Sequence, residues 1–520
     1  MGIPSYYKTL CDRIPGLLVK KIPVTPTHFW VDFNCMVYHC IRRPGAAIYA
    51  GEDTRIQWEN EIIEDVCKYL KKLVEIVGPT EMVYVGVDGV VPMAKIRQQR
   101  LRRFKSVWTA TEEKRIGVRN CGEPHWDTNS ITPGTAFMER LGIALHKIPS
   151  GSVKWIVSAA DEPGEGEHKL MYHMRNCPEG IHVVYGLDAD LIVLSILQNK
   201  NIWLFREAME MGIKGRPSND ATKKICGDMG GQEYSYFNIQ RLREHIGGDE
   251  SYIFDYCMGM SLLGNDFLPH SMSVKLKEGG HDMLLSMLKE VRLIHGTLCE
   301  GGSWKDDALR SCFSWLAKTE QDLIQKSILE KVEKRYQRTR GTNEREHALD
   351  EWNKTPLRMC DDLALIDKNK LRADWRSVYY QRYLGVTSQK DLDKVCERYC
   401  YGLQWICKYY IGEAINQKWY FHWYLPPLWS DLEAWIGKNM LVRGSMNNLE
   451  PIKPQEQLSL VLPLQSYWLV RDKKLRRLPT EKPQYWPKSF ELFTTGHKQM
   501  WECEAIIPIL GMVDLLQHQL

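Results

Sequence analysis

Two pairs of carboxylates follow two consecutive apolar runs at a spacing suited to metal chemistry. WIVS (155–158) precedes Glu165 and Glu167, and HVVYGL (182–187) precedes Asp188 and Asp190. Both runs are rich in β-branched and aromatic residues, as buried parallel strands are. Carboxyl ends of parallel strands line the ligand crevice of an α/β sheet, so we expect one shared site. The carboxylates would repel one another there unless cations held them, and an all-oxygen set favours Mg²⁺ or Mn²⁺. A solvated acidic loop is the alternative.

Three further carboxylates are predicted to join this site. HFWVDFN (28–34) and EMVYVGVDG (81–89) are predicted strands that end near Asp32 and Asp88. Asp266 lies on a turn after the apolar helix predicted in 254–270. The candidate acidic set is therefore Asp32, Asp88, Glu165, Glu167, Asp188, Asp190 and Asp266.

A basic helix face follows Asp88 directly. In VPMAKIRQQRLRRFKS (91–106), Pro92 suits a helix start. Four polar residues at spacing i, i+4, i+7 and i+8 then share one face of that helix: Lys95, Gln99, Arg102 and Arg103. Cationic side chains beside a group of carboxylates indicate a site that holds a phosphate next to metal ions. A solvated basic helix face is the alternative.

The elements that must position these residues alternate between strand and helix. Apolar residues at helical spacing predict a helix over 58–77, which Gly78-Pro79 ends. Strand–helix–strand alternation predicts an α/β fold with a parallel sheet and right-handed crossovers. Between about 206 and 250 the pattern weakens, and Gly-rich KICGDMGGQE (224–233) predicts a surface excursion.

Bulk properties narrow the class of protein. The 520 residues are 44% hydrophobic and 26% charged, which is ordinary for a soluble globular protein. This length predicts two or three domains or one large, elaborated domain. A net charge of +4 does not by itself indicate a polyanion partner. The 15 cysteines lack CxxC pairs, and Cys396, Cys400 and Cys407 have no zinc-spaced partners, so we expect free thiols in a reducing compartment. No signal region or membrane-spanning run is apparent, so we expect a soluble intracellular protein.

The second half carries fewer signals. Residues 296–356, with the charged run KVEKRYQRTRGTNEREH, predict a mobile or variable helical connector. Aromatics at helical spacing in 374–385 and 397–412 are expected in a core. The dense aromatics of KWYFHWYLPPLWSD (418–431) fit either a packed wall or a surface on which bases stack. Residues 440–520 contain no usable motif.

The chain resembles the Xrn-type 5′→3′ exoribonucleases over about 1–270 and 374–432. The resemblance rests on MGIPSYY, VDFN, DGVVPMAKIRQQRLRRF, ITPGTAFM, SAADEPGEGEHK, GLDADLI, LLGNDFLPH and YGLQWICKYYIG. It implies that the seven carboxylates bind two ions, Mg²⁺ or Mn²⁺, and that Lys95, Gln99, Arg102 and Arg103 bind a 5′-monophosphate. Three departures stand out. Tyr38, with His39 beside it, replaces the family's base-stacking His, and INQKW keeps Trp419 but places Gln417 at the other aromatic position. These make Tyr38, His39 and Trp419 the candidate stacking residues. The third departure is that this sequence contains neither the long C-terminal extension of the family's cytoplasmic members nor the zinc knuckle of some nuclear ones. We therefore expect a short, divergent or viral-like member.

The resemblance also implies an organisation and an activity. We expect a PIN-like, flap-nuclease-like core with helices on both faces of a parallel sheet (1–295), a charged helical connector (296–356), a second, mostly helical conserved region bracing the site (357–439) and a segment of unknown role (440–520). The implied activity is processive 5′→3′ degradation of 5′-monophosphorylated single-stranded RNA to mononucleotides. We expect a cytoplasmic monomer, with a nuclear location also open, that works with decapping factors and not at a membrane. A flap-type endonuclease on DNA and a non-catalytic RNA-binding scaffold are the alternatives.

Overall fold

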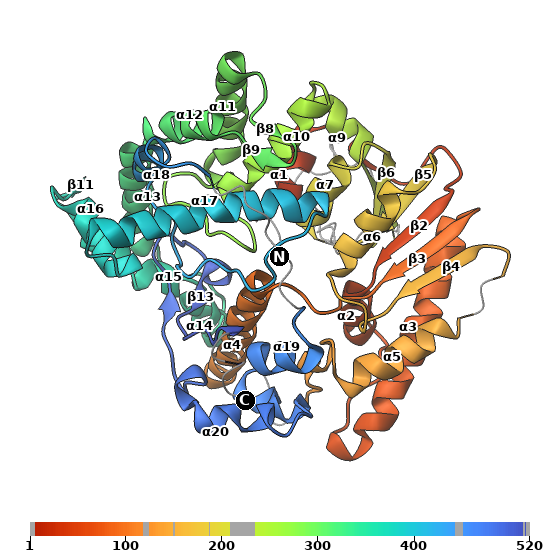
Figure 1. Cartoon of the computed structure of the whole chain (residues 1–520). Coiled ribbons are helices and arrows are strands. Elements are labelled where there is room, and N and C mark those ends of the chain that lie inside the picture. The colour runs from red at the N-terminus through yellow and green to blue at the C-terminus, as the bar shows by residue number, and fades with distance from the viewer. Residues whose placement is uncertain are drawn as a thin grey trace.

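A seven-stranded sheet forms the centre of the N-terminal half (Figure 1). The structure, a computed structural model, describes residues 6–117, 124–148, 151–186, 188–207, 234–441, 451–512 and 515. The strand order is β1-β7-β6-β5-β2-β3-β4, with β2 to β6 parallel to their neighbours in that set and β7 antiparallel to β6 and β1. The strands are β1 (Leu18–Val19), β2 (His28–Asp32), β3 (Met82–Gly86), β4 (Lys154–Ser158), β5 (Ile181–Tyr185), β6 (Asn201–Glu207) and β7 (Tyr234–Asn238). The predicted α/β class with a mostly parallel sheet is confirmed.

Helices cover both faces of this sheet because strand side chains alternate between two cores. Phe29 and Val31 of β2 pack with the helices of one face, α2 (Asn34–Arg42), α3 (Arg55–Val77) and α5 (Ala136–His146). Trp30 packs on the other face, which is covered by α1 (Tyr6–Arg13), α6 (Gly166–Arg175), α7 (Ala189–Ile196), α9 (Ile239–Ile246) and α10 (Glu250–Gly259). Gly78 ends α3 in the left-handed conformation that glycine tolerates, as the sequence predicted.

The region between 206 and 250 contains two elements that the sequence did not indicate. Strand β7 is largely buried and pairs with β6, and α9 follows it directly. A buried antiparallel strand of five residues gives too short a pattern to stand out beside a Gly-rich stretch. The surface excursion predicted for 224–233 lies outside the described residues.

Helices dominate residues 280–436. They are α11 (Gly280–His295), α12 (Asp306–Ala317), α13 (Glu320–Arg335), α14 (Glu344–Asn353), α15 (Thr355–Arg358), α16 (Trp375–Val378), α17 (Gln389–Ile411) and α18 (Trp429–Ile436). In the expected connector, α12 and α13 contribute Phe313 and Ile328 to the main core, whereas residues 336–347 are mostly exposed. Helix α17 crosses the molecule toward the sheet (Figure 1), and its Tyr399 and Trp405 are buried, as predicted for these aromatics.

The C-terminal segment packs around the basic helix α4 (Met93–Arg115). Its elements include α19 (Pro454–Val461), α20 (Leu478–Glu481), β12 (Leu492–Phe493) and β13 (Glu504–Ala505). Arg100 of α4 donates to the carbonyl of Leu460 at 2.7 Å, and Lys105 donates to the carbonyl of Met500 at 2.6 Å. No role could be predicted for this segment, and the structure shows that it packs on the helix that carries the predicted phosphate-binding residues.

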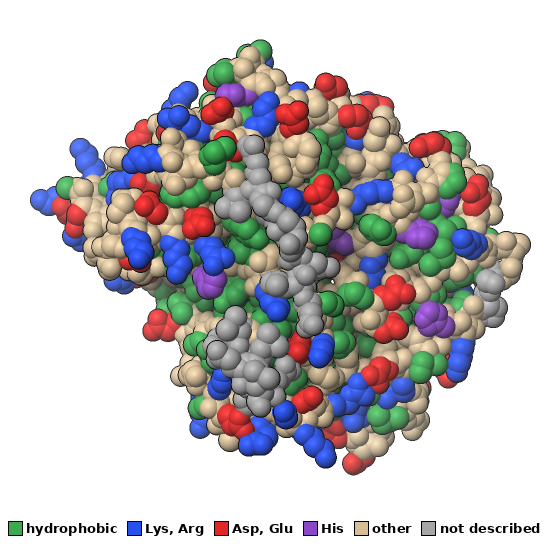
Figure 2. Space-filling view, in the orientation of Figure 1, with side chains coloured by type: hydrophobic (Ala, Val, Ile, Leu, Met, Phe, Trp, Pro, Cys, Tyr) green, Lys and Arg blue, Asp and Glu red, His purple; other side chains and the backbone are tan. Residues whose placement is uncertain are grey.

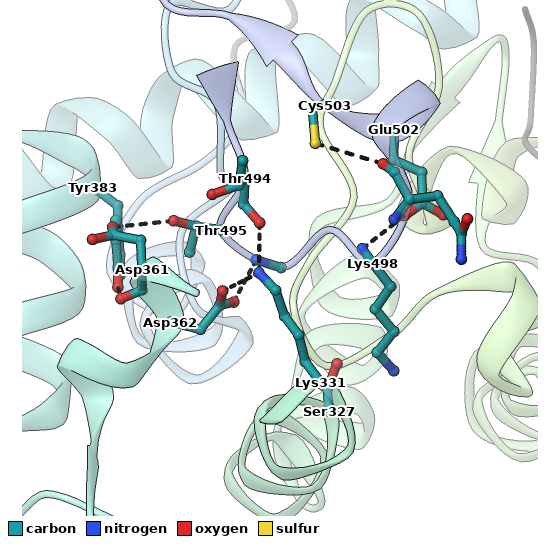
Figure 3. Close-up of polar contacts among 12 residues, drawn as sticks. Ser327, Lys331, Asp361, Asp362, Tyr383, Thr494, Thr495, Lys498, Glu502 and Cys503 are labelled. Carbon is teal, nitrogen blue, oxygen red and sulfur yellow. Dashed lines mark hydrogen bonds and ion pairs between the residues drawn. The ribbon is translucent and has the colours of Figure 1, made fainter. Parts of the chain in front are cut away.

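A buried charge cluster anchors the same segment to α13 (Figure 3). Lys331 forms an ion pair with Asp362 and donates to the carbonyl of Thr494 at 2.8 Å. Asp362 also accepts from the backbone N–H of Gly496 at 2.6 Å. We call Lys331, Asp362, Thr494 and Gly496 the Lys331 cluster. Each of its charges faces an opposite charge or dipole.

Two further expectations concern thiols and membranes. The cysteines within the described ranges are free thiols, and Cys396, Cys400 and Cys407 are buried. Across the same ranges, no helix has the length and apolar character needed to cross a membrane.

Candidate active site

Four adjacent strands, β5, β2, β3 and β4, deliver carboxylates to one edge of the sheet. Asp32 ends β2, Asp88 follows β3 by two residues, and Glu165 and Glu167 lie at the start of α6 after β4. Asp188 and Asp190 lie at the start of α7, directly after β5. From β2 the sheet continues through β3 and β4 on one side, and the chain then returns to add β5 and β6 on the other side of β2. Parallel sheets bind ligands at such a switch point. The structure thus brings together the two pairs from which the sequence reasoning began.

Short contacts hold the ends of these strands and the start of α6 together. The backbone N–H of Gly166, at the start of α6, donates to Asp88 at 2.7 Å, and the side chain of Asn34 donates to the same carboxylate at 2.8 Å. A Cβ atom on Gly166 would lie only 2.8 Å from Oδ1 of Asp32. The same Cβ would lie 2.7 Å from the backbone carbonyl oxygen of Gly86, at the end of β3. Glycine is therefore required at this position, because any side chain would push α6 away from β3.

We call the group formed by Asp32, Asp88, Glu165, Glu167, Asp188, Asp190 and Asp266 the acidic cluster. Lys95 of α4 is a cation that contacts it. Its Nζ lies 2.5 Å from Oε2 of Glu165 and 2.8 Å from Oδ2 of Asp266. Burial acts to lower the pKa of Lys95, but Asp266 and Glu165 outweigh it and raise this pKa well above its usual value. Asp266, from the turn after α10, therefore shares this lysine with Glu165. Lys95 contacts metal-site candidates directly, so it belongs to the acidic cluster as much as to the basic helix face.

Asp32, Glu167 and Asp190 are not neutralised in this way. Burial, with Asp88 and Asp188 adding to it, raises the pKa of Asp32 well above its usual value. Burial and then Glu165 raise the pKa of Glu167, and burial and then Asp266 raise that of Asp190 to about 7. The described residues of the cluster therefore contribute more carboxylates than cations to neutralise them.

Two buried oxygens in the cluster also lack hydrogen-bond donors. Oε2 of Glu167 and Oδ1 of Asp190 have no partner within the described part of the chain, although both side chains are at least nine-tenths buried. Ligand atoms of Glu165, Glu167 and His168 lie within 4.8 Å of one another, which is close enough for a single ion to contact all three. Buried oxygens without donors in a set this rich in carboxylates fit a hard divalent cation.

The basic face of α4 lies beside this cluster, but its residues are not equivalent. Gln99 is buried with a side-chain oxygen that has no hydrogen-bond partner among the described residues, whereas Arg102 is exposed. Arg103 donates to the hydroxyl of Thr132 at 2.8 Å, and burial lowers its pKa to about 10. Figure 2 shows acidic and basic side chains intermixed over this side of the molecule. Within this site, the basic face of α4 is the feature suited to bind an anion.

The three candidate stacking residues lie in different surroundings. Tyr38 is half-buried and close enough to Arg103 to act on its charge. His39 stacks on the core residue Tyr69, with ring centroids 4.9 Å apart. Trp419 is 3% exposed and packs against Trp405. The stacking role stays a prediction for all three residues, but the packing favours it for Tyr38 and favours a core role for Trp419.

Two residues that support the acidic cluster were not indicated by the sequence. Tyr409 of α17 donates to Glu165 at 2.7 Å, and its ring lies 3.9 Å from that of His168. Lys169 donates to the carbonyls of Val87 and Ala159 at 2.8 and 2.9 Å and so ties the ends of β3 and β4 together. Tyr409 lies in a string treated only as core, and no local signal distinguishes it from its aromatic neighbours.

Models of two protein families match most of this chain. The family described as "XRN 5'-3' exonuclease N-terminus" matches residues 1–208, and the "Xrn1 helical domain" matches 249–361 and 359–519. The chain belongs to the XRN 5′-3′ exonuclease family. The first match contains six of the seven candidate carboxylates and the basic face of α4, and the second contains Asp266 and Tyr409.

Curated members of this family align over nearly the whole chain. The "5'-3' exoribonuclease 1" of Schizosaccharomyces pombe is 25% identical over 99% of this chain and 48% of its own length. The "5'-3' exoribonuclease 2 homolog" of Drosophila melanogaster is 25% identical over 98% of this chain and 70% of its own length. The "5'-3' exoribonuclease 1" of Homo sapiens is 25% identical over 99% of this chain and 34% of its own length. The chain thus spans only part of each relative.

Proposed function

We propose that the chain is a metal-dependent 5′→3′ exoribonuclease that degrades 5′-monophosphorylated single-stranded RNA processively to mononucleotides. The observation that carries this proposal is the convergence of four strand ends and Asp266 on a cluster that contains Lys95. Membership of the family and the names of the aligned relatives support it. On this proposal the sheet is the PIN-like, flap-nuclease-like core of the enzyme.

We further propose that the cofactor is Mg²⁺ or Mn²⁺ and that two ions bind. Ions bound there would lower the pKa of a coordinated water and stabilise the departing 3′-oxyanion. The chain's own residues prepare the site: Tyr409 and Lys95 orient Glu165, and Gly166 and Asn34 orient Asp88. The buried carboxylates that lack donors are the groups that such ions would pair with.

The basic face of α4 supplies the specificity on this proposal. Gln99, Arg102 and Arg103 can donate to a terminal phosphate, and Lys95 links that face to the carboxylates. A 5′-phosphate held there would place the first phosphodiester beside the acidic cluster, so one nucleotide would leave per cycle. A 5′-hydroxyl leaves the cations without an anion, and a triphosphate or cap exceeds a pocket for one phosphate. Decapping factors in the cytoplasm would be suitable partners because they generate 5′-monophosphates.

The test compares four RNAs of one sequence that differ only at the 5′ end: monophosphate, hydroxyl, triphosphate and cap. We expect the monophosphate RNA to disappear fastest and to yield mononucleotides without intermediate fragments. Arg102→Ala should slow that substrate and reduce the discrimination, whereas Arg476→Ala, on an exposed basic residue of the C-terminal segment, should not. Cleavage of circular RNA, or equal rates on all four RNAs, would contradict end recognition and favour a flap-type endonuclease. Binding without cleavage in Mg²⁺ or Mn²⁺ would indicate a scaffold.

A further inference from the structure

The aromatic stretch that begins at Lys418 has an inner and an outer side. Trp419 and Phe421 are 3% and 1% exposed and belong to the main core. Lys418 and His422 alternate with them along the chain and are more accessible, and His422 is exposed. The ring of His422 lies against that of Tyr420, with centroids 4.2 Å apart. The stretch is therefore a packed wall on its inner side, and it presents a cation and an imidazole on its outer side.

Cations from two helices lie around His422. Burial lowers the pKa of His422 to about 4, and three nearby charges contribute to this shift: those of Arg398, Arg97 and Lys394. Arg97 belongs to α4, whereas the other two belong to α17. A positive potential that several elements build together attracts a polyanion.

The first half of α17 collects its cations on one face. Lys390, Lys394 and Arg398 are spaced at i, i+4 and i+8, a spacing at which like charges repel one another. Figure 2 shows Lys and Arg side chains in a row over the first part of α17 as Figure 1 places it. None of the three forms an ion pair with a residue that the structure describes. The acidic residues of this half of the helix lie on the neighbouring faces: Asp391, Asp393 and Glu397.

This basic face and the acidic cluster lie toward opposite ends of α17. Tyr409, near the end of the helix, donates to a carboxylate of the cluster. At a rise of about 1.5 Å per residue, Lys394 and Tyr409 lie roughly 22 Å apart along the helix. The carbonyl of Gln417 accepts from the backbone N–H of Met93 at 2.8 Å, so Lys418 lies near the start of α4. A strip of cations thus leads from the helix with the predicted phosphate-binding residues to the first half of α17.

We propose that this strip binds the phosphates and bases of single-stranded RNA beyond its 5′ end. We call it the α17 track; its residues are Lys390, Lys394, Arg398, Lys418 and His422. Phosphates complement its cations, and the exposed imidazole offers a surface on which a base can stack. The choice of RNA as the occupant rests on the proposed function, because an enzyme that removes nucleotides from a 5′ end must hold the rest of the strand. A strand held on the track between cycles stays bound, as processive degradation requires.

The test measures RNA binding in EDTA by fluorescence anisotropy at several salt concentrations. Two RNAs of about 20 nucleotides differ only in a 5′-monophosphate or a 5′-hydroxyl. Lys390→Gln/Lys394→Gln removes two exposed charges from the track, and glutamine preserves the helix. The matched control, Lys68→Gln/Lys71→Gln, removes two exposed charges from α3, which has the same length as α17.

We expect the track variant to bind both RNAs about fivefold or more weakly than the wild type, and the control to bind them normally. The slope of log affinity against log salt should become shallower by about 1, because each phosphate contact on a single strand contributes about 0.7. His422→Ala should weaken binding severalfold without changing this slope, since stacking involves no ion release.

Unchanged affinity and slope in the track variant, or an equal loss in the control, would overturn the proposal. A loss confined to the 5′-monophosphorylated RNA would also overturn it, because the lysines would then act on the 5′ end. A protein that binds RNA through these lysines but hydrolyses none in Mg²⁺ or Mn²⁺ would refute the proposed function and leave the track standing. Hydrolysis of RNA by a track variant with unchanged binding would do the reverse.

Discussion

Two buried groups of charges in this protein are built in opposite ways. In the Lys331 cluster, Lys331 and Asp362 are each 1% exposed and pair with one another, and the backbone at Thr494 and Gly496 satisfies the rest (Figure 3). In the acidic cluster, Lys95 neutralises Glu165 and Asp266, while Asp32, Glu167 and Asp190 keep raised pKa values. The charges of a balanced cluster are satisfied by the fold itself, whereas the unpaired carboxylates of an unbalanced one must take up protons or bind a cation. We therefore interpret the first as structural and the second as functional.

The largest expected effect comes from Asp190→Asn. This change removes one charge from the unbalanced cluster without changing the shape of the side chain. We expect the rate of RNA hydrolysis to fall about a thousandfold or more, because metal ions supply several kcal/mol of transition-state stabilisation. The free energy of unfolding in EDTA should stay the same or rise, because repulsion is relieved. Single-turnover kinetics and urea unfolding measure the two quantities. An Asp190→Asn enzyme with near-normal activity would remove this carboxylate from the catalytic set.

Lys331→Met should show the opposite pattern. Removing one partner of a buried ion pair leaves the other charge uncompensated, so we expect a loss of about 3–5 kcal/mol in the free energy of unfolding. The folded fraction should retain its hydrolysis rate. The control is Lys68→Met, whose pair with Glu64 is 75% and 72% exposed and should cost less than about 1 kcal/mol. If both variants lose the same stability in urea, the Lys331 cluster is not a structural anchor.

Glu320 tests the case of a buried carboxylate that has backbone donors instead of a cation. The N–H groups of Trp429 and Ser430, at the start of α18, donate to it at 2.7 and 3.3 Å. Burial raises its pKa to about 7. The folded state then binds a proton that the unfolded state releases above about pH 4.3, so its stabilising contribution is lost as pH rises from there to about 7.

We expect this residue to make the protein roughly 3 kcal/mol less stable at pH 8 than at pH 4.5, since each pK unit corresponds to about 1.4 kcal/mol. Other titrating groups also change stability with pH, so the informative quantity is the difference from Glu320→Gln in urea unfolding at both pH values. A wild type and a Glu320→Gln variant with parallel pH profiles would show that Glu320 does not titrate in this range.

The smallest effect is expected for Tyr409→Phe, which removes the hydroxyl that donates to Glu165 from α17. Loss of one such hydrogen bond should lower kcat/KM about three- to tenfold and leave KM nearly unchanged. Tyr399→Phe is the matched control, because the hydroxyl of Tyr399 on the same helix has no partner among the described residues. Equal kinetics for the two variants would mean that α17 does not position the acidic cluster through Tyr409.

The sequence predicted those parts of the site that depend on local pattern. An apolar run that ends in a carboxylate marks a strand end, so Asp32, Asp88 and the pairs after β4 and β5 could be assigned to one edge. Helical spacing likewise predicted α3 and the basic face of α4. The fold class follows from the same alternation of strands and helices.

Contacts between distant segments could not be predicted in this way. Tyr409 and Glu165 are 244 residues apart, and Arg100 and Leu460 are 360 apart. Nothing in the local pattern of either partner specifies these contacts, because they depend on how complete elements pack. The same reason explains why residues 440–520 offered no role and why Lys95 was assigned only to the phosphate-binding face.

Metal binding tests the central interpretation most directly. Titration calorimetry with Mn²⁺ compares the wild type with Glu167→Gln/Asp190→Asn, which removes two of the charges that Lys95 leaves uncompensated. We expect two ions per wild-type chain, a rise in Tm as they bind, and the loss of at least one ion in the variant. A folded wild type that binds no Mn²⁺, or a variant that binds the same number equally tightly, would contradict the view that the unbalanced cluster is a metal centre.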